Sequence, residues 1–160
     1  MSFDKESCAD GVLIWQEHIP PVSPMQSAHD VIIRKLNEHS RLHPQDEDAL
    51  RSLAVRVRRL QADEDLMREG DEPGASALVL EGMVARYHAL ANGKRQYLSF
   101  HLPGDLPDAQ TLFLEKMDHT VCAVGKAAVA LIAHEDMLAL FKQRPSINVS
   151  LQIANPIDGR

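Results

Sequence analysis

Hydrophobic and polar residues alternate with a period of two where the central part of the chain begins. Val55 and Val57 alternate with Arg56 and Arg58, which is typical of a strand that is buried on one face. Further short apolar runs, separated by turns, predict strands over residues 77–80, 83–90, 95–102, 119–124 and 127–132. Short strands at this spacing predict an antiparallel sheet that rolls up on itself.

Asn92 and Gly93 form the clearest turn signal in the chain. Both residue types accept positive φ, which the tight turns of β-hairpins require. We therefore expect the strand that ends near Leu90 to fold back onto the strand that begins at Arg95. Weaker breaks are predicted at two other places, residues 70–74 and 81–82.

Helical patterns gather at the two ends of this strand-rich region. Val31, Ile32 and Leu36 fit one helical face and predict an amphipathic helix that ends near Ser40. Further helices are predicted over residues 44–53, around 109–114, near 137–141 and from 145 to about 154. The predicted fold class is mainly β with flanking helices, an antiparallel β-roll of the jelly-roll or double-stranded β-helix type.

The first 28 residues differ from the rest of the chain. They contain Pro20, Pro21 and Pro24 among scattered polar residues and show no sustained hydrophobic period. This composition predicts a flexible arm over residues 1–28. The roll domain is predicted over residues 29–146, and residues 147–160 are expected to begin a C-terminal helix or tail.

Composition and charge exclude several classes of partner. The chain has 160 residues, 44% of them hydrophobic, and a formal net charge of -6, which is typical of one soluble domain. Binding to nucleic acid or to an anionic membrane needs concentrated Lys and Arg. The longest apolar stretch near the start, residues 11–15, is too short for a signal peptide or a membrane span. We expect a cytoplasmic protein without a membrane partner.

Four short segments of the chain occur in one order and at a specific spacing. They are residues 81–87 (EGMVARY), 92–96 (NGKRQ), 98–105 (LSFHLPGD) and 118–120 (DHT). Together they resemble the effector domain of the cyclic AMP receptor protein/fumarate-nitrate regulator (Crp/Fnr) family of transcription regulators. The resemblance covers about residues 31–150 and implies a cyclic nucleotide-binding-like β-roll.

In this family a long C-terminal helix pairs two subunits and leads into a helix-turn-helix domain. The resemblance therefore implies a homodimer, with DNA bound only through a domain that is absent from this chain. The chain would be the sensor or effector domain of a regulator, in which a small-molecule effector shifts the helix that begins near Ile147. We expect at most weak self-association of this chain, because a short helical seam buries little area.

The family's ligand site is a cassette in which a short helix and an Arg hold a cyclic phosphate and a Glu holds the ribose. When residues 104–105 are placed on the family's Gly-Asp pair, the Arg position carries His119 and the Ser position carries Thr120. The ribose Glu position carries Ala109, and the cassette glycine position carries Asp108. The candidate ligand-binding residues implied by the resemblance are Asp108, Ala109, Gln110, His119 and Thr120.

Three of these positions depart from the family's pattern. His119 would leave the pocket without a fixed positive charge at neutral pH, because an imidazole has a pKa near ~6.5. Asp108 would cap the short helix and occupy N–H groups that a phosphate needs. Losing the Arg clamp and the ribose acceptor costs about 3–5 kcal/mol of binding free energy. We therefore expect no cyclic AMP binding of the usual kind, and no cofactor.

A few residues leave other chemistry open. An iron–sulfur cluster needs about four thiolates, and the chain has only Cys8 and Cys122. Haem needs a single ligand on each side, so His88, His101 and Cys122 stay candidates. The two histidines would be neighbours across the predicted hairpin, but no carboxylate is placed to complete a metal site. No catalytic motif is present, so we expect no enzyme; the alternative function is a ligand-free β-roll for interaction or dimerisation.

Overall fold

The computed structural model describes residues 24–156, with helices at both ends of this range and strands between them. The helices are α3 (Pro24–His39), α4 (Pro44–Arg51), α5 (His134–Gln143) and α6 (Pro145–Ala154). The strands are β1 (Arg56–Leu60), β2 (Asp65–Met67), β3 (Ala75–Glu81), β4 (Val84–Ala89), β5 (Arg95–His101), β6 (Thr120–Ala123) and β7 (Ala127–Ala133). A 3-10 helix, η1 (Ala109–Phe113), lies between β5 and β6.

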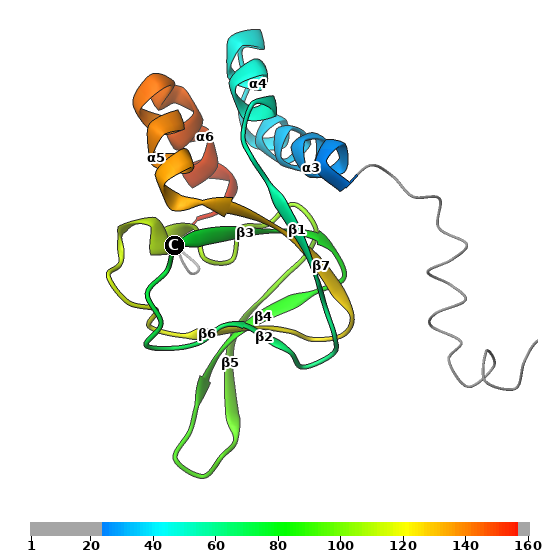
Figure 1. The fold of residues 1–160 in the computed structure, drawn as a ribbon, viewed down its shortest axis with the longest axis vertical. Helices are drawn as coiled ribbons and strands as arrows, with labels where there is room; N and C mark the ends of the chain where they lie inside the picture. Colours follow the sequence, from blue (N-terminus) through cyan, green and yellow to red (C-terminus); the bar gives the residue numbers. More distant parts are fainter. Residues whose placement is uncertain (1–23, 157–160) are drawn as a thin grey trace, which may run out of the picture.

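The strands form two antiparallel sheets that pack against each other (Figure 1). One sheet has the strand order β1-β7-β3, and the other has the order β2-β6-β4-β5. Strands far apart in sequence, such as β1 and β7, are neighbours, so the chain rolls up instead of meandering. The predicted fold class, mainly β with flanking helices in an antiparallel β-roll, is confirmed.

A buried apolar layer fills the space between the two sheets. Its members are Leu60, Ala77, Val79, Val84, Met117, Val121, Ala123, Ala127, Val129 and Leu131. Side chains alternate along β3, so Val79 faces this layer while Leu78 faces the helices. Both faces of β3 are buried, which explains why its sequence is a continuous apolar run instead of an alternating one.

The four helices lie together at one end of the roll, and the β4–β5 hairpin projects from the other end (Figure 1). Ile32 and Leu36 of α3 share one apolar cluster with Ile132 of β7 and Ile147 of α6. These contacts bury the outer face of the three-stranded sheet. None of the helices between residues 24 and 156 is long and apolar enough to cross a membrane.

A buried carboxylate links α4 to the corner between α5 and α6. Asp46 is only 1% exposed and accepts hydrogen bonds from Arg144 Nε at 2.7 Å and from Ser146 Oγ at 3.0 Å. The backbone N–H of His43 donates to its other oxygen at 3.2 Å. Burial raises the pKa of Asp46, but the hydrogen bonds from Arg144, His43 and Ser146 outweigh burial, and the pKa is lowered. This carboxylate is therefore charged at neutral pH.

The turn between β3 and β4 requires glycine. Gly82 has a φ of +76, and a Cβ there would lie 2.4 Å from the carbonyl oxygen of Lys126 and 3.0 Å from Cα of Ala127. At the break predicted at residues 81–82, the β3–β4 turn thus passes close to the turn between β6 and β7. The predicted hairpin between β4 and β5 is also confirmed, and its Gly93 has a φ of +82.

The two histidines on this hairpin are not neighbours. His88 lies opposite Gln96 near the turn, whereas His101 lies opposite Val84 at the far end of the strand pair. The prediction that they meet across the hairpin is wrong, because antiparallel pairing places residues equidistant from the turn opposite each other.

The first helix begins earlier than the sequence pattern predicts. α3 starts at Pro24, so residues 24–28 of the predicted arm are helical and that boundary is wrong. A proline fits the first turn of a helix, where its missing N–H would have no helical partner. The rest of the predicted arm, residues 1–23, and the tail residues 157–160 lie outside the described residues. Strand β2 is not predicted, since three residues are too few to show a period.

Candidate functional site

A cavity of about 650 Å³ lies between helix α6 and the loop that carries η1. This volume lies within the range of small-molecule sites. The lining residues are Arg86, His101, Asp105, Leu106, Pro107, Ala109, Leu112, Phe113, Asn148, Leu151, Gln152, Ala154, Asn155 and Pro156. Leu106 donates its backbone N–H to Asn155 Oδ1 at 3.0 Å, which holds the loop against the end of α6.

The turn after β5 shapes one edge of the cavity. The carboxylate of Asp105 accepts a hydrogen bond from the Leu102 N–H at 3.0 Å and pairs with Lys35 Nζ at 3.0 Å. The Val79 N–H donates to the Asp105 carbonyl at 3.0 Å. Gly104 takes a φ of +97, which glycine adopts without strain. This Gly-Asp pair therefore fixes the loop to the three-stranded sheet and to α3.

A buried arginine faces the cavity from β4. Arg86 is 4% exposed and lines the cavity, while its neighbours Ala85 and Tyr87 belong to a cluster on the outer face of the sheet. Its Nη2 atom lies 3.5 Å from Nδ1 of His119. A guanidinium is always charged in proteins. The prediction that the pocket lacks a fixed positive charge is therefore wrong, because a neighbouring strand supplies the charge.

His119 is buried and is not among the residues that line the cavity. Its side chain is 1% exposed, and its Nδ1 is hydrogen-bonded to the carboxylate of Asp118. Burial lowers the pKa of His119, as does the nearby charge of Arg86, while the hydrogen bond to Asp118 opposes the shift. The imidazole is therefore neutral at neutral pH.

Asp108 directly precedes η1, at the helix-capping position that the sequence predicts. It is fully buried, and its Oδ1 accepts a hydrogen bond from the N–H of Ala77 in β3 at 3.2 Å. Burial raises the pKa of Asp108 to about 7, against the lowering effects of backbone hydrogen bonds and of the Arg86 charge. The carboxyl group is therefore only partly ionised at neutral pH.

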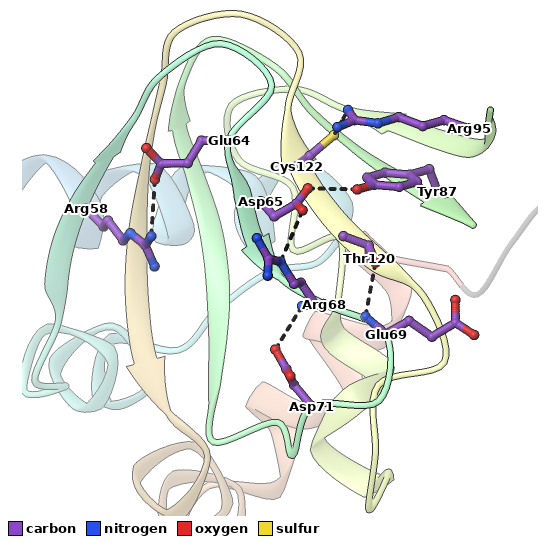
Figure 2. Close-up of polar contacts among 10 residues, drawn as sticks. All are labelled: Arg58, Glu64, Asp65, Arg68, Glu69, Asp71, Tyr87, Arg95, Thr120 and Cys122. Carbon is purple, nitrogen blue, oxygen red and sulfur yellow. Dashed lines mark hydrogen bonds and ion pairs between the residues drawn. The ribbon is translucent and has the colours of Figure 1, made fainter. Parts of the chain in front are cut away.

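The other predicted site residues lie on two different elements. Ala109 lines the cavity and begins η1, which also contains Gln110. Thr120 begins β6, and its Oγ1 accepts a hydrogen bond from the backbone N–H of Glu69 at 3.0 Å, as Figure 2 shows. Of the predicted residues whose side chains the structure describes, Ala109 alone lines the cavity.

Arg86 is the site residue that the sequence analysis missed. It stands in a strand whose neighbouring positions are buried and apolar. Strand alternation places it on the same face as Val84, which points between the sheets. A charge on an inward face is costly unless it makes a specific contact. This conflict between residue type and strand period is the signal that could have identified it.

The outer face of the four-stranded sheet carries a second polar network (Figure 2). The Tyr87 hydroxyl donates to Asp65 at 2.8 Å, and the guanidinium of Arg95 lies 4.4 Å from the centre of the Tyr87 ring. Arg95 also donates to the sulfur of Cys122 at 3.7 Å. Cys122 is buried under this network, and burial raises the pKa of its thiol.

The residues that the sequence leaves open for haem or a metal lie apart from one another. His88 bonds to Glu69 on the surface at 3.3 Å, whereas His101 lines the cavity and bonds to Ser99 Oγ at 2.8 Å. Cys122 lies in a third location, on the outer face of the four-stranded sheet. Within the part of the chain that the structure describes, no group of three His, Cys, Asp or Glu side chains could hold a metal ion.

We expect Asp108→Asn to flatten the pH dependence of stability. The pKa of Asp108 is raised to about 7 in the folded state, so the folded protein binds this proton more tightly than the unfolded chain does. The group's stabilisation is fully present below about pH 4 and is lost as pH rises to about 7. Between about pH 5 and pH 8 the free energy of unfolding of the wild type should fall by on the order of 2 kcal/mol. The Asp108→Asn variant should not show this loss.

Urea unfolding across this pH range measures the effect of Asp108→Asn. Asp48→Asn, on the exposed side of α4, is the matched control and should follow the wild type. Identical pH slopes for the wild type and Asp108→Asn would contradict the prediction.

Comparison with known proteins gives a family and a relative. The sequence profile described as the cyclic nucleotide-binding domain matches residues 57–144, more than half of the chain. The transcriptional activator protein FnrA of Stutzerimonas stutzeri is 29% identical over 110 residues, which are 69% of this chain and 45% of that protein. This chain therefore spans less than half the length of that relative.

Solved structures share the fold. The sensor domain of the transcriptional regulator DNR from Pseudomonas aeruginosa matches with a TM-score of 0.67 at 14% identity, over 81% of this chain and 87% of that one. The catabolite activator protein of Thermus thermophilus matches with a TM-score of 0.60 at 25% identity, over 73% of this chain and 54% of that one. The chain belongs to the cyclic nucleotide-binding domain family, and the resemblance to Crp/Fnr effector domains that the sequence predicts is confirmed.

Proposed function

We propose that the chain is the sensor domain of a Crp/Fnr-type transcription regulator and that it does not bind cyclic AMP in the family's usual way. The matching profile and the regulator relatives support the first part. One observation carries the second part: His119, at the position of the phosphate-clamping Arg, is buried and neutral and does not line the cavity.

The residues around the cavity also support the proposal that cyclic AMP is not bound in the family's usual way. Ala109 has no oxygen to accept a ribose hydroxyl, and Asp108 places a carboxyl group at the start of η1, where the family's cassette binds phosphate. The Thr120 hydroxyl oxygen already accepts a hydrogen bond from the backbone N–H of Glu69. The one guanidinium among the lining residues comes from β4, a different strand from the one that carries residue 120.

We do not propose a catalytic function for the chain. Ser99, His101 and Asp105 have the order of a nucleophile, a base and an acid, with 2.8 Å between the Ser and His side chains and 3.9 Å between the His and Asp side chains. The carboxylate of Asp105, however, holds Lys35 and the Leu102 N–H. The hydroxyl of Ser99 is not among the groups that line the cavity.

We also propose that the protein forms a homodimer, because α6 exposes two apolar side chains. Val149 and Ile153 are 58% and 51% exposed and lie one turn apart, so they share one face of the helix. A second copy of α6 would cover them. In such a regulator, a region outside residues 24–156 would bind DNA in the cytoplasm. The same apolar pair favours the alternative function, a ligand-free roll that only dimerises. If this alternative is right, no small molecule will raise the melting temperature of the chain.

We expect isothermal titration calorimetry to detect no saturable binding of cyclic AMP to the wild type below about 1 mM. His119→Arg alone should add little affinity. It places a second guanidinium at a buried site beside Arg86, where like charges repel in a low dielectric. The triple variant His119→Arg, Ala109→Glu, Asp108→Gly supplies the clamp, the ribose acceptor and the cassette glycine, and should bind at least about tenfold more tightly than His119→Arg.

Thermal unfolding of each variant must accompany the titrations, because Asp108→Gly also removes a hydrogen bond to Ala77. Only variants with a cooperative transition are compared. Micromolar binding of cyclic AMP by the wild type would overturn the proposal.

A further inference from the structure

We infer that the cavity binds a small uncharged molecule that carries a carboxamide group on an apolar body. Asn148 and Gln152 of α6 hold the carboxamide, and the η1 loop contacts the apolar body. This inference rests on the proposed function, since it names the class of effector for a sensor that does not take cyclic AMP. Three features of the cavity carry it: the partners of its ionisable groups, its pair of amide side chains, and its apolar walls.

The ionisable groups that line the cavity already have partners within the chain. The carboxylate of Asp105 pairs with Lys35 Nζ at 3.0 Å. His101 Nε2 lies 2.8 Å from Ser99 Oγ, and Arg86 also interacts with other groups of the protein. A charged ligand would lose its own hydration and would have to displace one of these contacts, which costs free energy. The cavity therefore favours an uncharged ligand.

Two amide side chains of α6 line the cavity one helical turn apart. Gln152 Nε2 donates a hydrogen bond to Asn148 Oδ1 at 3.1 Å. Within residues 24–156 neither side chain makes another hydrogen bond, so Asn148 keeps an N–H donor and Gln152 keeps a carbonyl acceptor. A carboxamide presents the complementary pair, a carbonyl oxygen and an N–H group, on neighbouring atoms. One carboxamide can therefore bond to both side chains.

The rest of the cavity wall is mostly apolar. Leu106, Leu112 and Phe113 come from the η1 loop, and Leu151 and Ala154 come from α6. Phe113 is 67% exposed, so its aromatic ring is available to a ligand. An aromatic or aliphatic body of about ten non-hydrogen atoms fits the volume of about 650 Å³ and gains affinity from burying apolar surface. Such a ligand contacts the η1 loop and α6 together.

The test is a titration followed by the amide ¹H–¹⁵N spectrum of the chain, with phenylacetamide and hexanamide as probes. We expect saturable shifts at Leu106, Leu112 and Leu151, which line the cavity, with a midpoint below about 5 mM for at least one amide. Phenylacetate has the same shape as phenylacetamide but carries a charge and lacks the N–H donor. It should bind at least about tenfold more weakly. Acetamide, which has no apolar body, should give no saturable shifts at the same concentrations.

Two variants test the amide pair. Asn148→Asp replaces the N–H donor with a carboxylate oxygen of the same shape and keeps the acceptor for Gln152, and it should weaken binding of phenylacetamide at least about fivefold. Gln152→Met removes the acceptor with a side chain of similar length and should weaken binding to a similar degree. Asn148 is half-buried and Gln152 is exposed, so neither substitution disturbs the buried core. Gln143→Glu adds a negative charge at an exposed position of α5 outside the cavity, and this matched control should leave the affinity unchanged.

Three results would overturn the inference: neither amide binds, phenylacetate binds as tightly as phenylacetamide, or both Asn148→Asp and Gln152→Met bind phenylacetamide as tightly as the wild type does. Micromolar binding of cyclic AMP would overturn the proposed function instead. A wild type that binds neither the amides nor cyclic AMP refutes this inference alone.

Discussion

Replacing Gly82 by alanine should destabilise the roll by about 3–5 kcal/mol, which is a large part of the stability of a typical domain. Two causes add. The φ of +76 is strained for any residue with a Cβ, and that Cβ would lie 2.4 Å from the carbonyl oxygen of Lys126. The obstacle is backbone, so the β3–β4 turn or the β6–β7 turn must move. Urea unfolding followed by circular dichroism measures the loss.

Gly93 provides the matched control for this prediction. It has a similar φ of +82 in the β4–β5 turn, but nothing lies within 4 Å of the position that a Cβ would take. Gly93→Ala therefore carries the backbone strain alone and should cost about 1 kcal/mol. Equal losses for the two variants would show that the crossing of the two turns contributes nothing.

Removing the carboxylate of Asp46 should cost about 3 kcal/mol of stability. This side chain accepts hydrogen bonds from Arg144, Ser146 and the His43 backbone, and Asp46→Ala leaves all three donors without it. Arg144 is one-third exposed and can turn to water, which limits the loss. Asp48→Ala, on the exposed side of the same helix, should cost little. Similar losses for the two variants would contradict the assigned role of Asp46.

The same carboxylate makes stability fall in acid. The pKa of Asp46 is lower in the folded state than in the unfolded chain, so its contribution is present above the unfolded value of about 4 and is lost as pH falls through the folded pKa. Asp46→Ala should therefore lose less stability than the wild type as pH falls below about 4. This sign is opposite to that for Asp108, whose folded pKa is raised.

Local patterns predicted most of the strands because each carries its own signal. The alternation at Val55 and Val57, the apolar runs of β3 and β7, and the Asn92–Gly93 turn depend only on neighbours in sequence. β2 has three residues and no period, so its pairing with β6 depends on contacts far apart in sequence. The opposite partners of His88 and His101 likewise follow from the register of the strand pair.

The site was harder to predict than the fold. Family resemblance directs attention to residues 108–110 and 119–120, where the departures from the cassette are found. The charge that lines the cavity comes instead from Arg86, which the sequence presents only as one residue in a strand. Its proximity to His119 arises from the pairing of β4 with β6, across 33 residues of sequence. No pattern of neighbouring residues in the sequence shows that these two side chains lie close together.

We propose that this cavity does not serve as a cyclic AMP clamp. Nuclear magnetic resonance tests it most directly, through the amide ¹H–¹⁵N spectrum of the chain titrated with cyclic AMP to about 1 mM. We predict no saturable shifts at Leu106, Ala109 and Leu151, which line the cavity from the loop, η1 and α6. Saturable shifts of these three amides with a shared micromolar midpoint would contradict it.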